Sequence, residues 1–101
     1  MAAPAHPRTI QHSGNTREQL TATAEQFGWT VINDGTQVVY RKAPYSAMVD
    51  YRRGDCAVLT AQLFQDAPPR TGLMPRMLED IPARGYDHKN KRVKYWLLVY
   101  H

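Results

Sequence analysis

Basic side chains are concentrated in one short segment near the C-terminal end of the chain. Between positions 84 and 94, lysines and arginines are opposed by a single acidic residue, Asp87. Lysines and arginines clustered in this way can bind the phosphate oxygens of nucleic acids. The segment is therefore either a phosphate-binding patch or a solvated loop whose charge favours solubility. The candidate phosphate contacts are Arg84, Lys89, Lys91, Arg92 and Lys94.

An apolar segment, VKYWLLVY, follows this basic cluster, and we expect a final strand from about residue 92 to residue 100. In an antiparallel sheet with one face in water, alternate residues of such a strand should be polar. Here both alternating sets are mostly apolar, so either the chain covers both faces itself or a partner covers one. Tryptophan and tyrosine are favoured anchors of protein interfaces. The candidate protein-binding residues are Trp96, Leu98 and Tyr100.

Residues with catalytic or metal-binding chemistry do not converge on any recognisable motif. The sequence has no glycine-rich phosphate loop, no G-x-S-x-G and no H-E-x-x-H. The adjacent carboxylates Glu79 and Asp80 are either a solvated pair or a metal-binding pair. The histidines lack zinc-ligand spacing with Cys56, whose thiol is either reactive or a small buried apolar group in a strand. We expect no enzyme activity, no metal, no cofactor and no small-molecule substrate.

The composition is typical of a small globular protein. The chain has 101 residues, of which 43% are hydrophobic and 22% charged, and its formal net charge is +4. This mildly basic charge is compatible with a nucleic acid or an acidic protein surface as partner. The single cysteine favours a reducing compartment, and no apolar run approaches the roughly 20 residues that span a bilayer. Because the sequence MAAPAHPRTIQ also lacks the apolar region of a signal peptide, we expect a cytoplasmic protein without membrane association.

The N-terminal part is expected to begin with an arm and continue with a helix. Residues 1–14 contain two prolines and a glycine without an apolar period, which predicts a flexible arm. Asn15 or Thr16 can cap a helix, with a glutamate or glutamine three positions further on to complete a capping box. The helix would run from about residue 16 to residue 27, and Gly28 suits its C-terminal cap.

The apolar period then changes from about 3.6 to 2, which indicates strands. WTVIN precedes Asp34-Gly35, a strong hairpin signal, and TQVVYRK returns. Pro44 marks the next break, YSAMVDYR alternates between two faces, and a turn around Gly54 leads to CAVLTAQLF. These segments predict a four-stranded antiparallel meander.

The segment LMPRMLEDIPARG is expected to form a short second helix. Met74, Met77, Leu78 and Ile81 recur at the spacing of one helical face, and prolines stand near both ends. With the final strand, the predicted fold is α+β: an N-terminal helix, the four-stranded meander, a short second helix and a C-terminal strand, with the helices on one face of the sheet. Residues 15–101 would form this single domain.

Three short motifs occur between about residue 17 and residue 63. They are Gly28-Trp29, Val39-Tyr40-Arg41, and the set Val49, Tyr51 and Gly54. In these motifs this part of the chain resembles the small accessory proteins encoded by bacteriophages of actinobacteria, notably mycobacteriophages. Those proteins often carry a short amphipathic helix ending in GW or GY, followed by strands with V-Y-R-like and V-x-Y-x-x-G-like ends. The resemblance implies a viral protein in the cytoplasm of a host cell and implies no activity.

Two functional hypotheses follow from the sequence. The first is a small phage-encoded module without catalytic activity that binds a host protein or a second copy of itself. The alternative is a nucleic-acid-binding protein that uses the basic 84–94 loop on phosphates.

Overall fold

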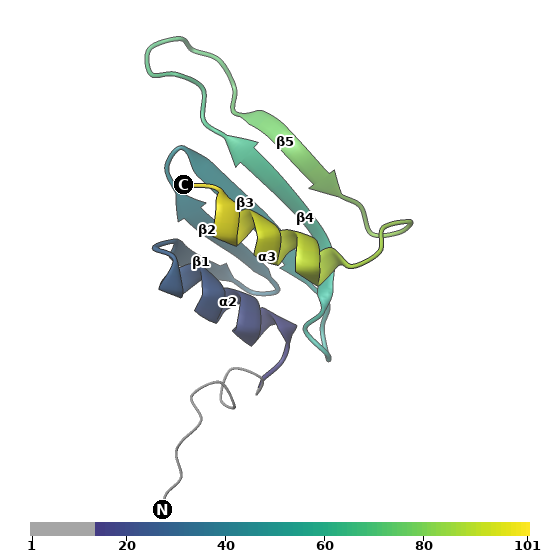
Figure 1. The fold of residues 1–101 in the computed structure, drawn as a ribbon. Helices are drawn as coiled ribbons and strands as arrows, with labels where there is room; N and C mark the ends of the chain where they lie inside the picture. The colour runs from purple at the N-terminus through teal and green to yellow at the C-terminus, as the bar shows by residue number, and fades with distance from the viewer. Residues whose placement is uncertain (1–13) are drawn as a thin grey trace, which may run out of the picture.

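A computed structural model describes residues 14–101, so the predicted arm at residues 1–14 lies outside the described residues except for Gly14. The described part contains two helices and one sheet, and Figure 1 shows their arrangement. In chain order the elements are α2 (Thr16–Gln26), β1 (Thr30–Asp34), β2 (Gln37–Lys42), β3 (Tyr45–Tyr51), β4 (Val58–Gln65), β5 (Arg76–Ile81) and α3 (Lys89–Val99).

Helix α2 forms where the capping residues predict it. The Asn15 side chain accepts a hydrogen bond from the Glu18 backbone N–H at 2.9 Å, and the Glu18 carboxylate accepts one from the Asn15 N–H at 2.9 Å. This reciprocal capping box satisfies two amides that the first helical turn leaves without partners. After the helix, Gly28 has φ +87°, a left-handed conformation that glycine adopts without a Cβ clash.

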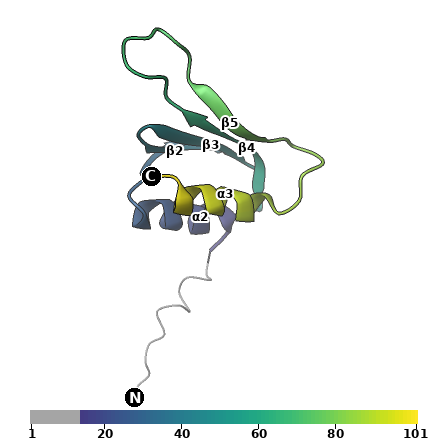
Figure 2. The same cartoon turned by 45° about the horizontal axis from the view of Figure 1, so that its top comes forward.

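All five strands form one antiparallel sheet in the order β1-β2-β3-β4-β5, each strand pairing with the next along the chain. The first four strands confirm the predicted meander. Both helices lie on the same face of this sheet, as Figures 1 and 2 show. The opposite face is covered by no element of residues 14–101.

The predicted second helix is wrong, because residues 76–81 form strand β5. Pro75 and Pro82 leave six residues between them, which as a helix would be less than about two turns long. In an extended conformation the same residues pair with the edge of β4, where Gln62 lies opposite Asp80. Leu78 is the extra residue at an irregularity in this pairing, and its side chain packs against the core.

The predicted final strand is also wrong, because residues 89–99 form helix α3. Val93, Trp96 and Leu97 are fully buried at i, i+3 and i+4 spacing, so one face of the helix collects the apolar side chains. A strand would have divided these residues between two faces. The chain thus ends with a helix that packs beside α2 and against the sheet.

The hydrophobic core lies between the two helices and the sheet. Its largest fully buried side chains include Trp96, Tyr40 and Tyr51. The Trp29 indole Nε1–H donates a hydrogen bond to the Leu97 carbonyl at 3.0 Å and so joins the start of β1 to the last turn of α3. The hydroxyls of Tyr40 and Tyr51 lie 2.7 Å apart. Neither helix of residues 14–101 is long and apolar enough to cross a membrane.

Candidate functional site

The five predicted phosphate-binding residues fall into two groups in the structure: some make intramolecular hydrogen bonds, and the others are exposed. The Lys89 ammonium donates to the carbonyls of Leu59 and Ala83, both at 2.7 Å, which ties the start of α3 to the sheet. The Arg92 guanidinium donates to Glu79 at 2.8 Å, and this hydrogen bond raises the pKa of Arg92 above its ordinary value. Two of the five cations therefore stabilise the fold, and the other three, which are exposed, are Arg84, Lys91 and Lys94.

The three predicted protein-binding residues do not share one surface. Trp96 is fully buried against the sheet, with 0% of its surface exposed. Tyr100 is half-buried, and its ring meets that of Tyr45 edge-on with 5.0 Å between centroids. Leu98 is 40% exposed. The reason is the helix itself, which turns residues two positions apart by about 200° instead of placing them on one strand face.

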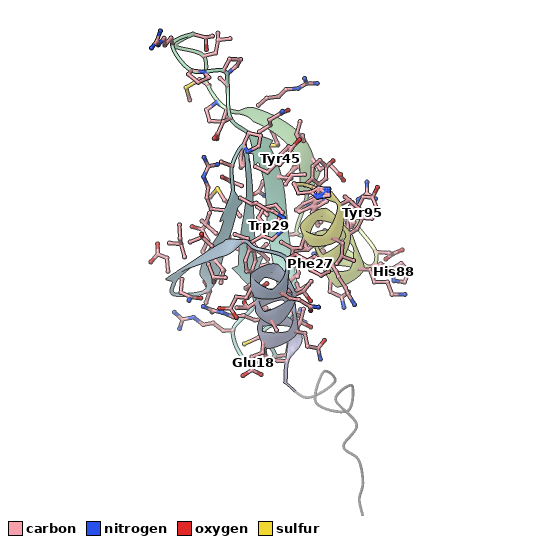
Figure 3. All side chains as sticks on the ribbon, turned by 60° about the vertical axis from the view of Figure 1, so that its left-hand side comes forward. Glu18, Phe27, Trp29, Tyr45, His88 and Tyr95 are labelled. Atoms are coloured by element: carbon pink, nitrogen blue, oxygen red, sulfur yellow. The ribbon has the colours of Figure 1, made fainter. Side chains whose placement is uncertain are left out.

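The exposed side of α3 carries basic and apolar side chains together, and we call it the helix face. Helix α3 contains no acidic residue. Figure 3 shows Tyr95 on the side of α3 turned away from α2, and Phe27 between the two helices. A surface groove of about 880 Å³ runs between the helices, with Glu18 on its α2 wall and Lys91, Lys94 and Leu98 on its α3 wall. The helix face consists of Lys91, Lys94, Tyr95, Leu98 and Val99.

A second apolar surface lies on the sheet side that faces away from both helices, and we call it the open sheet face. Strand residues alternate between the two faces. Val38, Tyr40, Ala47 and Val49 are buried beneath the helices, so their neighbours in sequence point the other way. The strand register places these outward residues in cross-strand rows. The apolar members of the open sheet face are Ile32, Val39, Met48, Phe64 and Met77.

These apolar residues are neighbours across the strands. Ile32 pairs with Val39, which pairs with Met48, and this makes a continuous apolar row from β1 to β3. Phe64 pairs with Met77 in the adjoining row on β4 and β5. About half of the Ile32 and Met77 surfaces is exposed, at 50% and 51%.

The open sheet face is acidic. Asp50 accepts a hydrogen bond from the Thr60 hydroxyl at 3.4 Å, and Asp80 accepts one from the Gln62 amide at 3.1 Å. Together with Asp34 they are three carboxylates that no lysine or arginine of residues 14–101 neutralises in an ion pair. Arg41, on the same face, is matched by Asp66.

Two further carboxylates, Asp66 and Asp55, are each paired with an arginine. The Arg41 guanidinium holds the pKa of Asp66 below its ordinary value, and the Arg52 guanidinium lowers the pKa of Asp55 to about 2. Both carboxylates therefore stay charged and matched at neutral pH. The unmatched negative charge of the sheet is concentrated on Asp34, Asp50 and Asp80.

The connection between β4 and β5, residues 66–75, extends beyond the other strands in Figure 1. Its second half exposes Leu73 and Met74, with 68% and 83% of their surfaces in solvent. Neither side chain belongs to the hydrophobic core. This connection therefore adds exposed apolar side chains just before β5.

The apolar character of the open sheet face was not predicted from the sequence, although one signal for it was present. In YSAMVDYR, the set Ser46, Met48, Asp50 and Arg52 is polar except for Met48. Whether that set faces water or a helix depends on where the C-terminal segment packs, and this segment was predicted to be a strand. Once α3 joins α2 on a single face, Met48 is left on the uncovered one.

Cys56 lies in the turn between β3 and β4 and not in a strand as predicted; it is half-buried and has φ +57°. Among residues 14–101, no group of three or more histidine, cysteine or acidic residues could hold a metal ion. No family model matches the chain, and the comparisons with curated proteins and with solved structures give no match either.

Proposed function

We propose that the protein is a small protein-binding module that uses the open sheet face. The observation that carries this proposal is the continuous row of Ile32, Val39 and Met48 on a sheet face that no described element covers. Exposed apolar patches with a polar rim mark protein interaction sites in soluble proteins. Asp34, Asp50 and Asp80 supply such a rim here.

Covering this face would provide a driving force for binding. Apolar surface removed from water contributes about 25 cal/mol per Å². Ile32 and Met77 each keep half of their surface in solvent, so a partner has apolar area to bury. The strands already hold these side chains in place, which reduces the ordering cost of association.

Two features favour a protein over a nucleic acid as partner. Three unmatched carboxylates on the open sheet face would repel phosphates. In the basic segment, the side chains of Lys89 and Arg92 make intramolecular contacts, so fewer cations are free to bind phosphates. The remaining cations, Arg84, Lys91 and Lys94, are the basis of the rival nucleic-acid function.

The resemblance to phage accessory proteins suggests where the partner is to be found. A phage-encoded module of this kind would act in the cytoplasm of an actinobacterial host, either on a host protein or on further copies of itself. No catalytic step belongs to this proposal.

The proposal can be tested by affinity capture from an actinobacterial lysate with tagged wild-type chain and tagged Met48→Lys. Met48 is half-buried on the open sheet face, and a lysine there would place a charge at the end of the apolar row on β3. We expect proteins retained by the wild-type chain to be lost with Met48→Lys. Ala83→Lys adds the same charge in the exposed loop before α3 and should retain them.

The same capture should be repeated after nuclease treatment. Retention that survives nuclease but not Met48→Lys supports binding through the open sheet face. Equal retention by Met48→Lys and wild-type chains, with both folded by circular dichroism, would reject it. Retention that disappears with nuclease and in a Lys91→Glu/Lys94→Glu variant would favour the rival function.

A further inference from the structure

The helix face and the open sheet face lie on opposite sides of the molecule and carry opposite charge. We propose that the helix face of a second copy occupies the open sheet face, so that copies associate head to tail. This inference rests on the proposed function, because it names the partner of the same surface. The occupant is a second copy, because the chain itself presents a surface that complements the sheet.

The helix face provides the basic and apolar half of the contact. Successive residues turn by about 100° around a helix, so Lys91, Tyr95 and Leu98 lie within one narrow stripe. This stripe is opposite the buried Val93 and Trp96. Tyr95 and Leu98 are 47% and 40% exposed, so apolar area remains available beside the lysines.

The open sheet face provides two carboxylates that the flexible lysine side chains can reach. Asp34 and Asp50 stand in one cross-strand row, through Gln37 on β2. Two strand spacings separate them, about 10 Å. Lys91 and Lys94 are offset by about 4.5 Å along the helix axis, and their long, flexible side chains can extend to carboxylates this far apart.

The apolar groups match along the perpendicular direction. The row of Ile32, Val39 and Met48 lies two residues along the strands from the acidic row, about 7 Å away. On the helix, Leu98 lies four residues beyond Lys94, about 6 Å. A helix running along the strands would therefore place its lysines over the carboxylates and its apolar end over the apolar row.

The resulting contact has a defined symmetry. Because the helix face of one copy meets the sheet face of another, the interface is heterologous and not twofold. Each added copy still presents one unoccupied face of each kind, so assembly can continue beyond a dimer. Within the contact, a sheet covered by helices on both faces forms the three-layer α/β/α arrangement.

Sedimentation of the purified chain over a range of concentrations at low salt tests the inference. We expect the wild-type chain to grow in mass with concentration beyond the dimer. Asp34→Lys/Asp50→Lys and Lys91→Glu/Lys94→Glu should each weaken this association about tenfold or more, because each places like charges opposite one another. A chain with all four substitutions restores opposite charges and should associate again.

Arg53→Glu/Arg70→Glu is the matched control, since both arginines are exposed in turns outside the two faces and the change in charge equals that of the lysine variant. It should associate like the wild-type chain. A chain that stays monomeric at all concentrations, or a four-substitution variant that does not regain association, overturns the inference. If the lysate capture is still sensitive to Met48→Lys in that case, the proposed function stands with a different partner.

Discussion

The two tryptophans are both buried but differ in how their indole N–H groups are satisfied. The Trp29 N–H donates to the Leu97 carbonyl. This carbonyl belongs to the last turn of α3, where the helix itself provides no N–H donor for it. The buried N–H of Trp96 has no hydrogen-bond partner within residues 14–101. The indole N–H therefore adds a stabilising hydrogen bond at Trp29 but not at Trp96.

We predict that Trp29→Phe destabilises the protein more than Trp96→Phe does. Both changes replace an indole by a smaller ring, but only the first removes a hydrogen bond and leaves a carbonyl without its donor. The difference in free energy of unfolding should be about 1–3 kcal/mol. Urea denaturation followed by far-ultraviolet circular dichroism measures it, and equal stabilities would contradict the role given to Trp29.

The roles of individual basic residues could not be predicted from the sequence. Lys89 and Lys91 are the same residue type, two positions apart, so the sequence does not distinguish them. In the structure, Lys89 donates to the carbonyls of Leu59 and Ala83, whereas Lys91 is exposed. The difference depends on which side of α3 each residue occupies. It also depends on Leu59, a residue thirty positions away in the chain.

At the scale of elements, the N-terminus of helix α3 has a strained backbone and no side-chain cap. His88, its N-cap residue, has φ +59° and makes no side-chain capping hydrogen bond. A residue with a Cβ in this left-handed conformation is strained by about 1–2 kcal/mol, whereas glycine is not.

We predict that His88→Gly raises the stability of the protein by up to about 1 kcal/mol, because relief of strain outweighs the greater freedom of glycine in the unfolded chain. Thermal unfolding provides the measurement. His88→Ala is the control, since alanine keeps the Cβ and should bring no gain. A loss of stability in the glycine variant would show that the His88 side chain contributes more than its strain costs.

The elements that could be predicted are those whose signals are local. The capping box of α2 and the Asp34-Gly35 hairpin signal each specify their structure within a few residues, although the turn itself consists of Gly35 and Thr36. The C-terminal half lacks such signals. Residues 76–81 have helical spacing of apolar groups but pair with the edge of β4, and residues 92–100 are rich in strand-forming types but pack as a helix.

One feature of the sequence did indicate the helix. Both alternating sets of VKYWLLVY are apolar, which is unusual for a strand with one wet face. Val93, Trp96, Leu97 and Tyr100 follow the i, i+3, i+4, i+7 period, which accounts for this pattern without a partner. The protein interface was predicted on a C-terminal strand, and it is now proposed on the open sheet face instead.

At the scale of the whole molecule, the core contains a chain of hydroxyl groups that connects α2 to the centre of the sheet. The Thr21 hydroxyl lies 2.8 Å from that of Tyr40, which in turn lies 2.7 Å from that of Tyr51. Burial raises the pKa of both tyrosines above the ordinary value of 10.0. The folded protein therefore keeps both phenols protonated at a pH where the unfolded chain releases their protons.

We predict that the free energy of unfolding falls as the pH rises above about 10, by up to about 1.4 kcal/mol per pH unit for each buried tyrosine. Below that pH both states hold the proton, so the contribution is fully present. Tyr51→Phe removes one titrating group, and Tyr40 keeps Thr21 as its partner. Denaturation at several alkaline pH values should show a shallower decline for this variant, and identical slopes would contradict the prediction.

The distribution of charge is also a property of the whole molecule. A net charge of +4 suggests a basic protein, but the structure separates basic residues on α3 from unmatched carboxylates on the open sheet face. Composition alone cannot reveal this separation, because it depends on which face each strand residue takes. The proposed association would be governed by these two faces and not by the net charge.

The β4–β5 connection offers a route to labelling the protein. Residues 66–75 extend past the neighbouring strands, and Leu73 and Met74 in their second half do not pack against the core. The entropy of closing a loop grows slowly with its length, so doubling it costs only about 0.6 kcal/mol. An epitope or fluorophore could therefore be placed within residues 66–75 to label the protein, while both faces and the core keep their contacts. The length of this connection should also vary more readily than that of any other turn of the sheet.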